Sequence, residues 1–427
     1  MDDEGGVHTF EDPGPDARAV RVPGRANLIG EHIDYLGLPV LPMALDRVVR
    51  IRFRHRTDAR VRLRNTGPHG AAELTAGPAI YPADDWSDYV RAGVQAVART
   101  LGSRQSAAPT LHGWDGVVSS DLPEAAGLAS SSALVVAAAV ATLDANQATV
   151  PPLELATILA EGERYVGTAG GGMDQAVCLA GRHGHALRID FDPLRATPIP
   201  IPDDWAFVVA HSLERAEKSR AAREAYNRRS RQARDALAEV ADRLRGRERR
   251  ADGDPATTDS RAGSGTAMAR ELLADHAPDT LLAVGDRALD ATGLARLRHV
   301  VTEAARVEAA ERALRSADMD AFGRLMDVSH ASLRDDYEVS TGALDALMAF
   351  AREAGARGAR LTGAGFGGCI VALCPLDGAD ALMAALHREF YALRGMDDPV
   401  GAGLLFRAVP SDGARVEPVT PGGPGAA

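Results

Sequence analysis

The chain has 427 residues, a length that favours two domains, each large enough to bury its own core. Hydrophobic residues make up 45% and charged residues 25%, which is the globular range, and no apolar run approaches the length of a membrane span. The formal net charge of −11 disfavours a nucleic-acid partner, because phosphate backbones bind to concentrated Lys and Arg. We therefore expect a soluble protein with neither a membrane nor a nucleic-acid partner.

The N-terminal sequence MDDEGG lacks the basic and apolar regions of a secretory signal, so we expect a cytoplasmic location. Residues 1–17 are rich in Asp, Glu, Gly and Pro and are interpreted as a disordered tail. The runs VVRIRFRHR and ARVRLRN then predict strands, and a helix is expected from about Trp86 to Leu101. The first half therefore has the pattern of an α+β fold.

Four chemically active side chains lie within the glycine-punctuated segment 24–47: Arg25, Glu31, His32 and Asp34. Functional residues occur more often in such loops than in regular elements. Glu31, His32 and Asp34 offer the donors and acceptors that hold sugar hydroxyls, and the permanent cation Arg25 suits a phosphoryl group. The alternative is a charged turn before a strand, although a turn requires none of these four residues together.

A second segment, 119–139, reads SSDLPEAAGLASSSALVVAAA. A strand ends near Ser120, a loop of small residues follows, and an apolar run begins a helix directly after Ser130, Ser131 and Ser132. Small residues let backbone N–H groups approach an anion and the helix N-terminus adds partial positive charge, so the segment predicts a phosphate cradle. A serine-capped buried helix explains the pattern equally well, because the GK[ST] ending of a Walker A loop is missing.

A third segment, GTAGGGMDQAV at 167–177, places Asp174 after three consecutive glycines. This arrangement exposes the carboxylate at the mouth of a loop, where a base can reach a substrate hydroxyl. A helix N-cap is the alternative role for Asp174. The preceding helical pattern offers Glu161 and Glu163 as metal ligands, or as surface carboxylates.

A proline-rich strand end at 200–204 predicts a boundary between domains at 18–203 and 204–408. The arginines from Arg220 to Arg250 alternate with Ala, Glu and Asp at helical spacing, as on a solvated helix face. Residues 245–266 have the composition of a flexible insertion, and residues 409–427 that of a second disordered tail.

The segment LTGAGFGGCIVAL at 361–373 contains four glycines. A dinucleotide fingerprint would need a strand before these glycines and a helix after them, whereas a strand follows here. We therefore expect this loop to pack its backbone against another loop, such as the phosphate cradle. Cys178, Cys369 and Cys374 lack metal-site or disulfide spacing and are expected to be buried.

Five segments in order resemble the galactokinase branch of the galactokinase, homoserine kinase, mevalonate kinase and phosphomevalonate kinase (GHMP) superfamily. They are GRANLIGEHIDY, PEAAGLASSSA, GGGMDQ, SHASLRDDYEVS (329–340) and LTGAGFGGC. The resemblance spans residues 20 to 408. It implies a two-domain α+β fold whose N-terminal half is like ribosomal protein S5 domain 2, with the active site between the halves.

The resemblance also implies an ATP- and Mg²⁺-dependent sugar 1-kinase acting as a monomer or weak homodimer. Asp174 would be the catalytic base, and Arg25 would stabilise the phosphoryl group and keep Asp174 ionised. The implied sugar contacts are Glu31, His32, Asp34, Gly171 and Tyr226. The implied ATP loop is Ala125, Ala126, Gly127, Leu128, Ala129, Ser130 and Ser131, and the implied metal ligands are Ser131 and Glu163, with Glu161 as the alternative carboxylate.

The sugar itself stays open at this point. Ile33, GTAGGGMDQ and PLRAT (193–197) resemble a sub-branch that includes N-acetylgalactosamine kinases beside galactokinases. Galactose is the leading prediction, with N-acetylgalactosamine or another monosaccharide as alternatives. A catalytically silent regulator that binds galactose and ATP is the alternative outside the enzymes, although such proteins lose part of the machinery and this chain keeps Arg25, Ser131 and Asp174.

Overall fold

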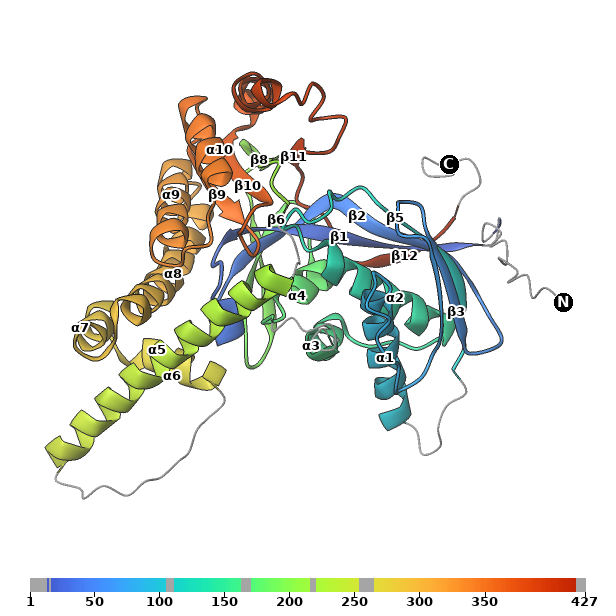
Figure 1. Cartoon of the computed structure of the whole chain (residues 1–427), viewed down its shortest axis with the longest axis horizontal. Helices are drawn as coiled ribbons and strands as arrows, with labels where there is room; N and C mark the ends of the chain where they lie inside the picture. The colour runs from blue at the N-terminus through green and yellow to red at the C-terminus, as the bar shows by residue number, and fades with distance from the viewer. Residues whose placement is uncertain are drawn as a thin grey trace.

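Two β-sheets with helices packed against them make up the frame of the molecule (Figure 1). The computed structural model describes residue 14 and residues 17–104, 111–162, 170–215, 220–252 and 265–419. Among these residues, the first sheet has six strands in the order β12-β1-β2-β5-β3-β4, the second has four in the order β11-β8-β10-β9, and β6 pairs with β7. The mixture of sheets and helices confirms the predicted fold class.

The residue pattern of β2, the neighbour of β1, shows why the strands of the first half form. In β2, Val49, Ile51 and Phe53 are buried, while the alternating arginines between and after them point to the other face. This period of two is that of a strand with one covered face. The bounds are β1 (Arg18–Ile29), β2 (Leu41–His55), β3 (Arg60–Asn65), β4 (Ala71–Thr75), β5 (Trp114–Ser120), β6 (His185–Asp190) and β7 (Arg195–Pro200).

Helices of the first half cover the apolar face of this sheet (Figure 1). The central one, α2 (Ser130–Ala145), packs against both the sheet and α1, and its residues are apolar on nearly every side. A helix that is hydrophobic all round must be buried in this way. The other helices are α1 (Asp88–Ser103), α3 (Pro152–Gly162) and α4 (Met173–Ala180), and the 3-10 turn η1 spans Asp34–Leu36.

The second half carries most of its helices on one side of the four-stranded sheet. Helix α8 packs against α5, α7 and α9, and α9 packs against β9. The strands are β8 (Trp205–His211), β9 (Gly358–Thr362), β10 (Cys369–Pro375) and β11 (Leu405–Ala408). The helices are α5 (Arg220–Asp252), α6 (Gly265–Asp275), α7 (Pro278–Ala288), α8 (Ala291–Arg315), α9 (Met319–Asp335), α10 (Gly342–Glu353) and α11 (Ala379–Leu386), followed by η4 (His387–Tyr391) and η5 (Ala392–Arg394), with η3 (Leu376–Gly378) before α11.

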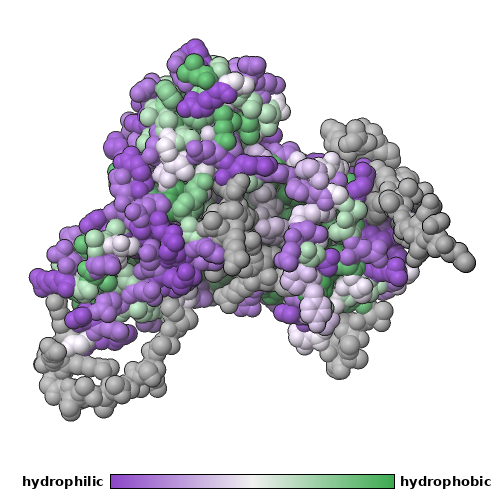
Figure 2. Space-filling model, in the orientation of Figure 1, coloured by the Kyte–Doolittle hydropathy of each residue, from purple (hydrophilic) through white to green (hydrophobic). Residues whose placement is uncertain are grey.

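The arginine-rich helix α5 has the solvated face that the sequence predicted. Ala233, Leu237 and Val240 are buried, whereas Arg228 and Arg231 are exposed. The surface over this helix is hydrophilic (Figure 2). All three cysteines are buried and none forms a disulfide, as expected. In the described part of the chain, no helix combines the length and the apolar character that crossing a membrane requires.

The predicted disordered tail at 409–427 is wrong in part, because β12 (Arg415–Pro418) joins the first sheet. It pairs antiparallel with β1, placing Val416 opposite Val20 and Arg415 opposite Arg21. Two of its four residues are charged, so the sequence shows no apolar run that would identify a strand. The pairing depends on the open edge of β1, which a local pattern cannot reveal.

The predicted flexible insertion at 245–266 also needs correction. Helix α5 continues to Asp252 and α6 begins at Gly265, while residues 253–264 lie outside the described residues. The run RGRERRAD has few apolar residues but good helix formers, and propensity decided its structure. The second sheet begins at Trp205, so we propose residues 200–204 as the domain boundary, as expected from the sequence.

Candidate active site

Two charged residues from distant segments meet at the centre of the site. Arg25 comes from β1 and Asp174 from the first turn of α4, and their Nε and Oδ1 atoms are 2.8 Å apart. The side chain of Arg25 is 6% exposed and that of Asp174 is 25% exposed, so the pair is covered on one side and open on the other. Burial alone would lower the pKa of Arg25, but Asp174 and Glu31 outweigh it and raise that pKa.

The loop before α4 explains why Asp174 sits where it does. Gly172 precedes the helix with a φ of 98°, a conformation that glycine adopts without steric cost. Asp174 lies in the first helical turn, where the N-terminal partial charge of the helix favours a carboxylate. Asp174 thus lies directly after the glycine run, in the first turn of α4, and its role as the base stays a prediction.

The second part of the site is the small-residue loop before α2. Ala125, Gly127 and Ala129 all have positive φ values, between 51° and 73°, which turn the backbone sharply. Ala129 makes no side-chain capping hydrogen bond to α2. The N–H of Arg25 donates to Leu128 O at 3.0 Å, and its guanidinium donates to Gly127 O, so this loop is bonded directly to the ion pair.

This loop fits a nucleotide phosphate on two structural grounds. The first turn of a 16-residue helix faces a backbone of small residues, and it lacks the side-chain cap that would otherwise satisfy its amides. Ser131 lies in this turn, where a hydroxyl can reach a metal ion held by phosphates. Mg²⁺ is commonly held by substrate phosphates with few protein ligands, and the described residues hold no group of three or more His, Cys, Asp or Glu that could form a metal cage.

Only one of the two predicted metal carboxylates lies among the described residues. Glu163 lies outside the described residues, and Glu161 is exposed near the C-terminal end of α3. The carboxylate ligand therefore stays a prediction.

The glycine loop at 363–368 packs against the phosphate cradle, as the sequence predicted. A Cβ added to Gly363 would lie 2.4 Å from the carbonyl oxygen of Gly127, and one added to Gly127 would lie 2.7 Å from that of Thr362. No side chain fits at such distances, so glycine is required on both sides of the contact.

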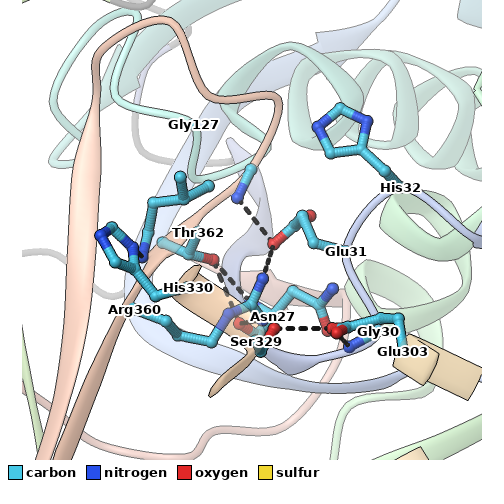
Figure 3. A network of polar contacts seen from close by, with 12 residues as sticks. Asn27, Gly30, Glu31, His32, Gly127, Glu303, Ser329, His330, Arg360 and Thr362 are labelled. Atoms are coloured by element: carbon cyan, nitrogen blue, oxygen red, sulfur yellow. Dashed lines mark hydrogen bonds and ion pairs between the residues drawn. The ribbon is translucent and has the colours of Figure 1, made fainter. Parts of the chain in front are cut away.

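The turn at Gly30–Asp34 brings the three predicted sugar-binding side chains to the same region. Glu31 is buried, and its Oε2 accepts hydrogen bonds from Gly363 N–H at 3.0 Å and Arg360 at 3.1 Å (Figure 3). His32 has a φ of 63°, and its Nε2 lies 3.1 Å from the carbonyl oxygen of Ala364. Glu31 and His32 therefore join the turn to the glycine loop.

The titration of this turn differs from that of free side chains. Burial lowers the pKa of His32 to about 3, with a further contribution from His299, so the ring is neutral at pH 7. Burial and the nearby Asp174 raise the pKa of Asp34 to about 6. The Oδ2 of Asp34 accepts a hydrogen bond from Gly171 N–H at 3.0 Å. Asp34 and Gly171, both predicted sugar contacts, therefore lie together beside the loop that precedes Asp174.

Tyr226 also lies in this region. Its ring centroid is 5.5 Å from that of His32 and 5.7 Å from that of Tyr35. Tyr35 and Tyr337 bond through their hydroxyls at 2.5 Å, and Tyr337 stacks at 4.9 Å from His32. Tyr226, an implied sugar contact, is thus brought together with His32.

Sequence reasoning missed Arg360, Tyr35 and Tyr337 as members of this region. Tyr35 ends the segment GRANLIGEHIDY, and Tyr337 lies in SHASLRDDYEVS. Both segments are recognised as motifs, but the resemblance assigns no role to either tyrosine. Arg360 lies in β9, three residues before Gly363, and is fully buried. A buried arginine needs a carboxylate partner, but the sequence does not show which one.

Comparisons with known proteins agree with this geometry. Residues 88–182 match the model of the GHMP kinases N terminal domain, residues 310–393 match GHMP kinases C terminal, and residues 7–55 match the galactokinase galactose-binding signature. The galactokinase of Roseiflexus sp. is 38% identical over 88% of each chain, and that of Chloroflexus aurantiacus is 37% identical over 89% of each.

Solved structures show the same fold. The Lactococcus lactis galactokinase complexed with galactose superposes with a TM-score of 0.75 at 27% identity, covering 94% of this chain and 95% of that one. The Methanococcus jannaschii mevalonate kinase, at 17% identity, has a TM-score of 0.55 over 87% of this chain and 95% of its own, and shows the fold alone. The chain thus belongs to the galactokinase family of the GHMP kinases, which are phosphotransferases.

Proposed function

We propose that the protein transfers the γ-phosphoryl group of ATP to the anomeric hydroxyl of galactose, giving galactose 1-phosphate and ADP. The observation that carries this proposal is the pairing of Arg25 with Asp174 at 2.8 Å beside the phosphate-type loop at 125–131. The match to a galactose-binding signature and the likeness to an enzyme complexed with galactose support this choice of sugar.

Asp174 is the base in this proposal. Its ion pair with Arg25 engages Oδ1, and the side chain keeps a quarter of its surface exposed. We assign the proton of the sugar hydroxyl to Oδ2, which turns that hydroxyl into the nucleophile for in-line attack.

Arg25 orients the base and spreads positive charge over the reaction centre. Its guanidinium bonds to Asp174 and to Gly127 O at the same time, so it fixes the carboxylate relative to the phosphate cradle. Positioning and charge stabilisation supply most of the catalysis in phosphoryl transfer, because little covalent chemistry is left to the protein.

When bound, MgATP supplies the phosphoryl group and the charge-neutralising metal. The residues at 125–131 would hold the phosphates through backbone N–H groups and the N-terminus of α2, and the Ser131 hydroxyl would contact Mg²⁺. His32, neutral and fixed by Ala364, and Asp34, fixed by Gly171, would orient the sugar hydroxyls together with Tyr226.

A coupled ADP-release assay with ATP and Mg²⁺ tests the proposal across galactose, N-acetylgalactosamine, glucose, arabinose and mevalonate. Turnover is expected with galactose and not with mevalonate. A preference for N-acetylgalactosamine would change the proposed substrate but leave the proposed phosphoryl transfer in place. Binding of galactose and ATP without ADP release would instead identify a silent regulator.

The proposal includes a cytoplasmic location and a monomer or weak homodimer without a nucleic-acid partner. Light scattering at two protein concentrations tests the oligomeric part, and a tetramer at both would contradict it.

A further inference from the structure

The turn that carries Glu31, His32 and Asp34 begins at a backbone position held by a distant residue. Gly30 has a φ of 101°, and its N–H donates to Oε1 of Glu303 at 2.8 Å. A Cβ on Gly30 would lie 2.9 Å from the Cα of Val40, so the turn is also closely packed on its other side. Glu303 lies in α8, in the second half of the chain, and contacts the turn across the two halves (Figure 3).

Glu303 is fully buried and bonded at both carboxylate oxygens. Its Oε1 also accepts from the Ser329 hydroxyl at 2.8 Å, and its Oε2 accepts from Arg306 Nε at 2.6 Å. Burial would raise the pKa of Glu303, but Arg306, His299 and Arg360 outweigh it and lower that pKa to about 2. The group bonded to Gly30 N–H is therefore a fixed, charged acceptor.

A second residue of α8 holds the carbonyl group of Glu31. His299 lies one helical turn before Glu303, and its Nε2 lies 3.0 Å from the carbonyl oxygen of Glu31. Because a carbonyl only accepts, Nε2 carries a proton, and Nδ1 lies 3.0 Å from the Ser332 hydroxyl oxygen. Two side chains of one helix thus bond to both sides of the Gly30–Glu31 peptide segment.

We propose that Glu303 is a positioning residue for sugar binding: its carboxylate fixes the Gly30 N–H and thereby the directions of Glu31, His32 and Asp34. The inference rests on the proposed function, because that function assigns His32 and Asp34 to the sugar. Ser329 supports Glu303, which gives the segment SHASLRDDYEVS a role that its sequence alone did not indicate. The hydrogen bonds of Glu303 go to Gly30, Ser329 and Arg306, and none goes directly to residues 125–131, so we expect the larger effect on the sugar.

Two double variants isolate the hydrogen bond from the buried charge. Glu303→Gln with Arg306→Met keeps an acceptor of similar shape and removes the ion pair, whereas Glu303→Met with Arg306→Met removes both. Replacing both members of a buried ion pair is better tolerated than removing one. Calorimetry measures the Kd for galactose of both double variants, and steady-state kinetics measures their KM for galactose and for ATP. Glu308→Met, on the exposed side of α8, is the control.

We expect the methionine pair to bind galactose about tenfold more weakly than the glutamine pair, with the ATP constants within about twofold. Equal galactose constants in the two pairs would overturn the proposal. So would a parallel rise in both substrates' constants, or a fall in kcat alone, because either result describes a general structural role. If the methionine pair does not fold, Ser329→Ala decides: an increase of about threefold in galactose Kd alone supports the proposal, and an unchanged value overturns it.

The same measurements separate this inference from the proposed function. Wild-type protein that binds galactose without phosphorylating it contradicts the kinase activity, while the ratio of galactose Kd values still decides the role of Glu303. Wild-type protein that neither binds nor phosphorylates any of the sugars contradicts both.

Discussion

Gly127 of the phosphate cradle and Gly363 of the glycine loop are in backbone contact, with room for no side chain between them. Gly363→Ala would place a Cβ 2.4 Å from Gly127 O, and the cradle must move to relieve the overlap. We expect kcat/KM for ATP to fall by about tenfold or more, since small displacements of positioned groups are costly to catalysis.

Gly355→Ala is the matched control for this substitution. Gly355 has a φ of 101°, close to the 89° of Gly363, but an added Cβ there meets nothing within 4 Å. Both variants place an alanine in the left-handed region of φ, but only Gly363→Ala brings the added Cβ too close to another atom. An equal loss of activity in the two variants would show that strain, and not the contact with Gly127, is responsible.

Asp174→Asn removes the proposed base while keeping the shape of the side chain. We expect turnover to fall by about 10²- to 10⁴-fold with ATP affinity retained, the usual contribution of a general base. Steady-state kinetics and nucleotide calorimetry measure the two effects, and Asp286→Asn, on the exposed side of α7, is the control. Near-normal turnover in Asp174→Asn would remove this residue from the mechanism.

Arg25→Lys tests whether the guanidinium must bridge two groups. Arg25 bonds at once to Asp174 and to Gly127 O, and a single ammonium cannot reproduce this planar fork. We expect kcat to fall by about 10²-fold, with melting temperature measured in parallel to check the fold. Retention of full kcat by the lysine variant would mean that only the charge matters.

The raised pKa of Asp34 predicts a pH-dependent sugar affinity. With a pKa of about 6, Asp34 carries a proton below that pH and is a carboxylate acceptor above it. We expect kcat/KM for galactose to rise as the pH increases through about 6, because this ratio reports the free enzyme. In Asp34→Asn, kcat/KM for galactose should not show this rise near pH 6. A rise that persists unchanged in the variant must come from another titrating group.

The buried histidines predict a loss of stability in acid. Burial lowers the pKa of His299 to about 4, whereas the unfolded chain takes up protons near the ordinary value of 6.5. The folded state therefore binds fewer protons between these values, so the free energy of unfolding decreases as the pH falls from 6.5 towards 4.

Urea midpoints at pH 7.5, 6.0 and 4.5 measure this dependence. His299→Gln should show a smaller decrease than the wild type, whereas the exposed His183→Gln should show the same decrease. Identical slopes in all three proteins would exclude His299 as a source of acid sensitivity.

The parts of the site that could be predicted are those written in short continuous segments. The glycine run before Asp174 and the small residues before Ser130 determine local backbone shape, so their loops follow from the sequence. The bonding of Glu31 to Arg360 and of Gly30 to Glu303 could not be foreseen, because residues some 330 and 270 positions apart share no local pattern. The strand β12 escaped prediction for the same reason, since its partner and not its composition makes it a strand.

That strand has a consequence for how the chain is made. Residues 18–21 leave the ribosome before the whole of the second half, whereas their partners at 415–418 emerge after it. Throughout synthesis of the second half, β1 is therefore an edge strand whose outward amide and carbonyl groups have no β12 to pair with. Completion of this sheet must therefore wait for β12, and until β12 has been made a growing chain can pair its exposed β1 edge with a neighbour.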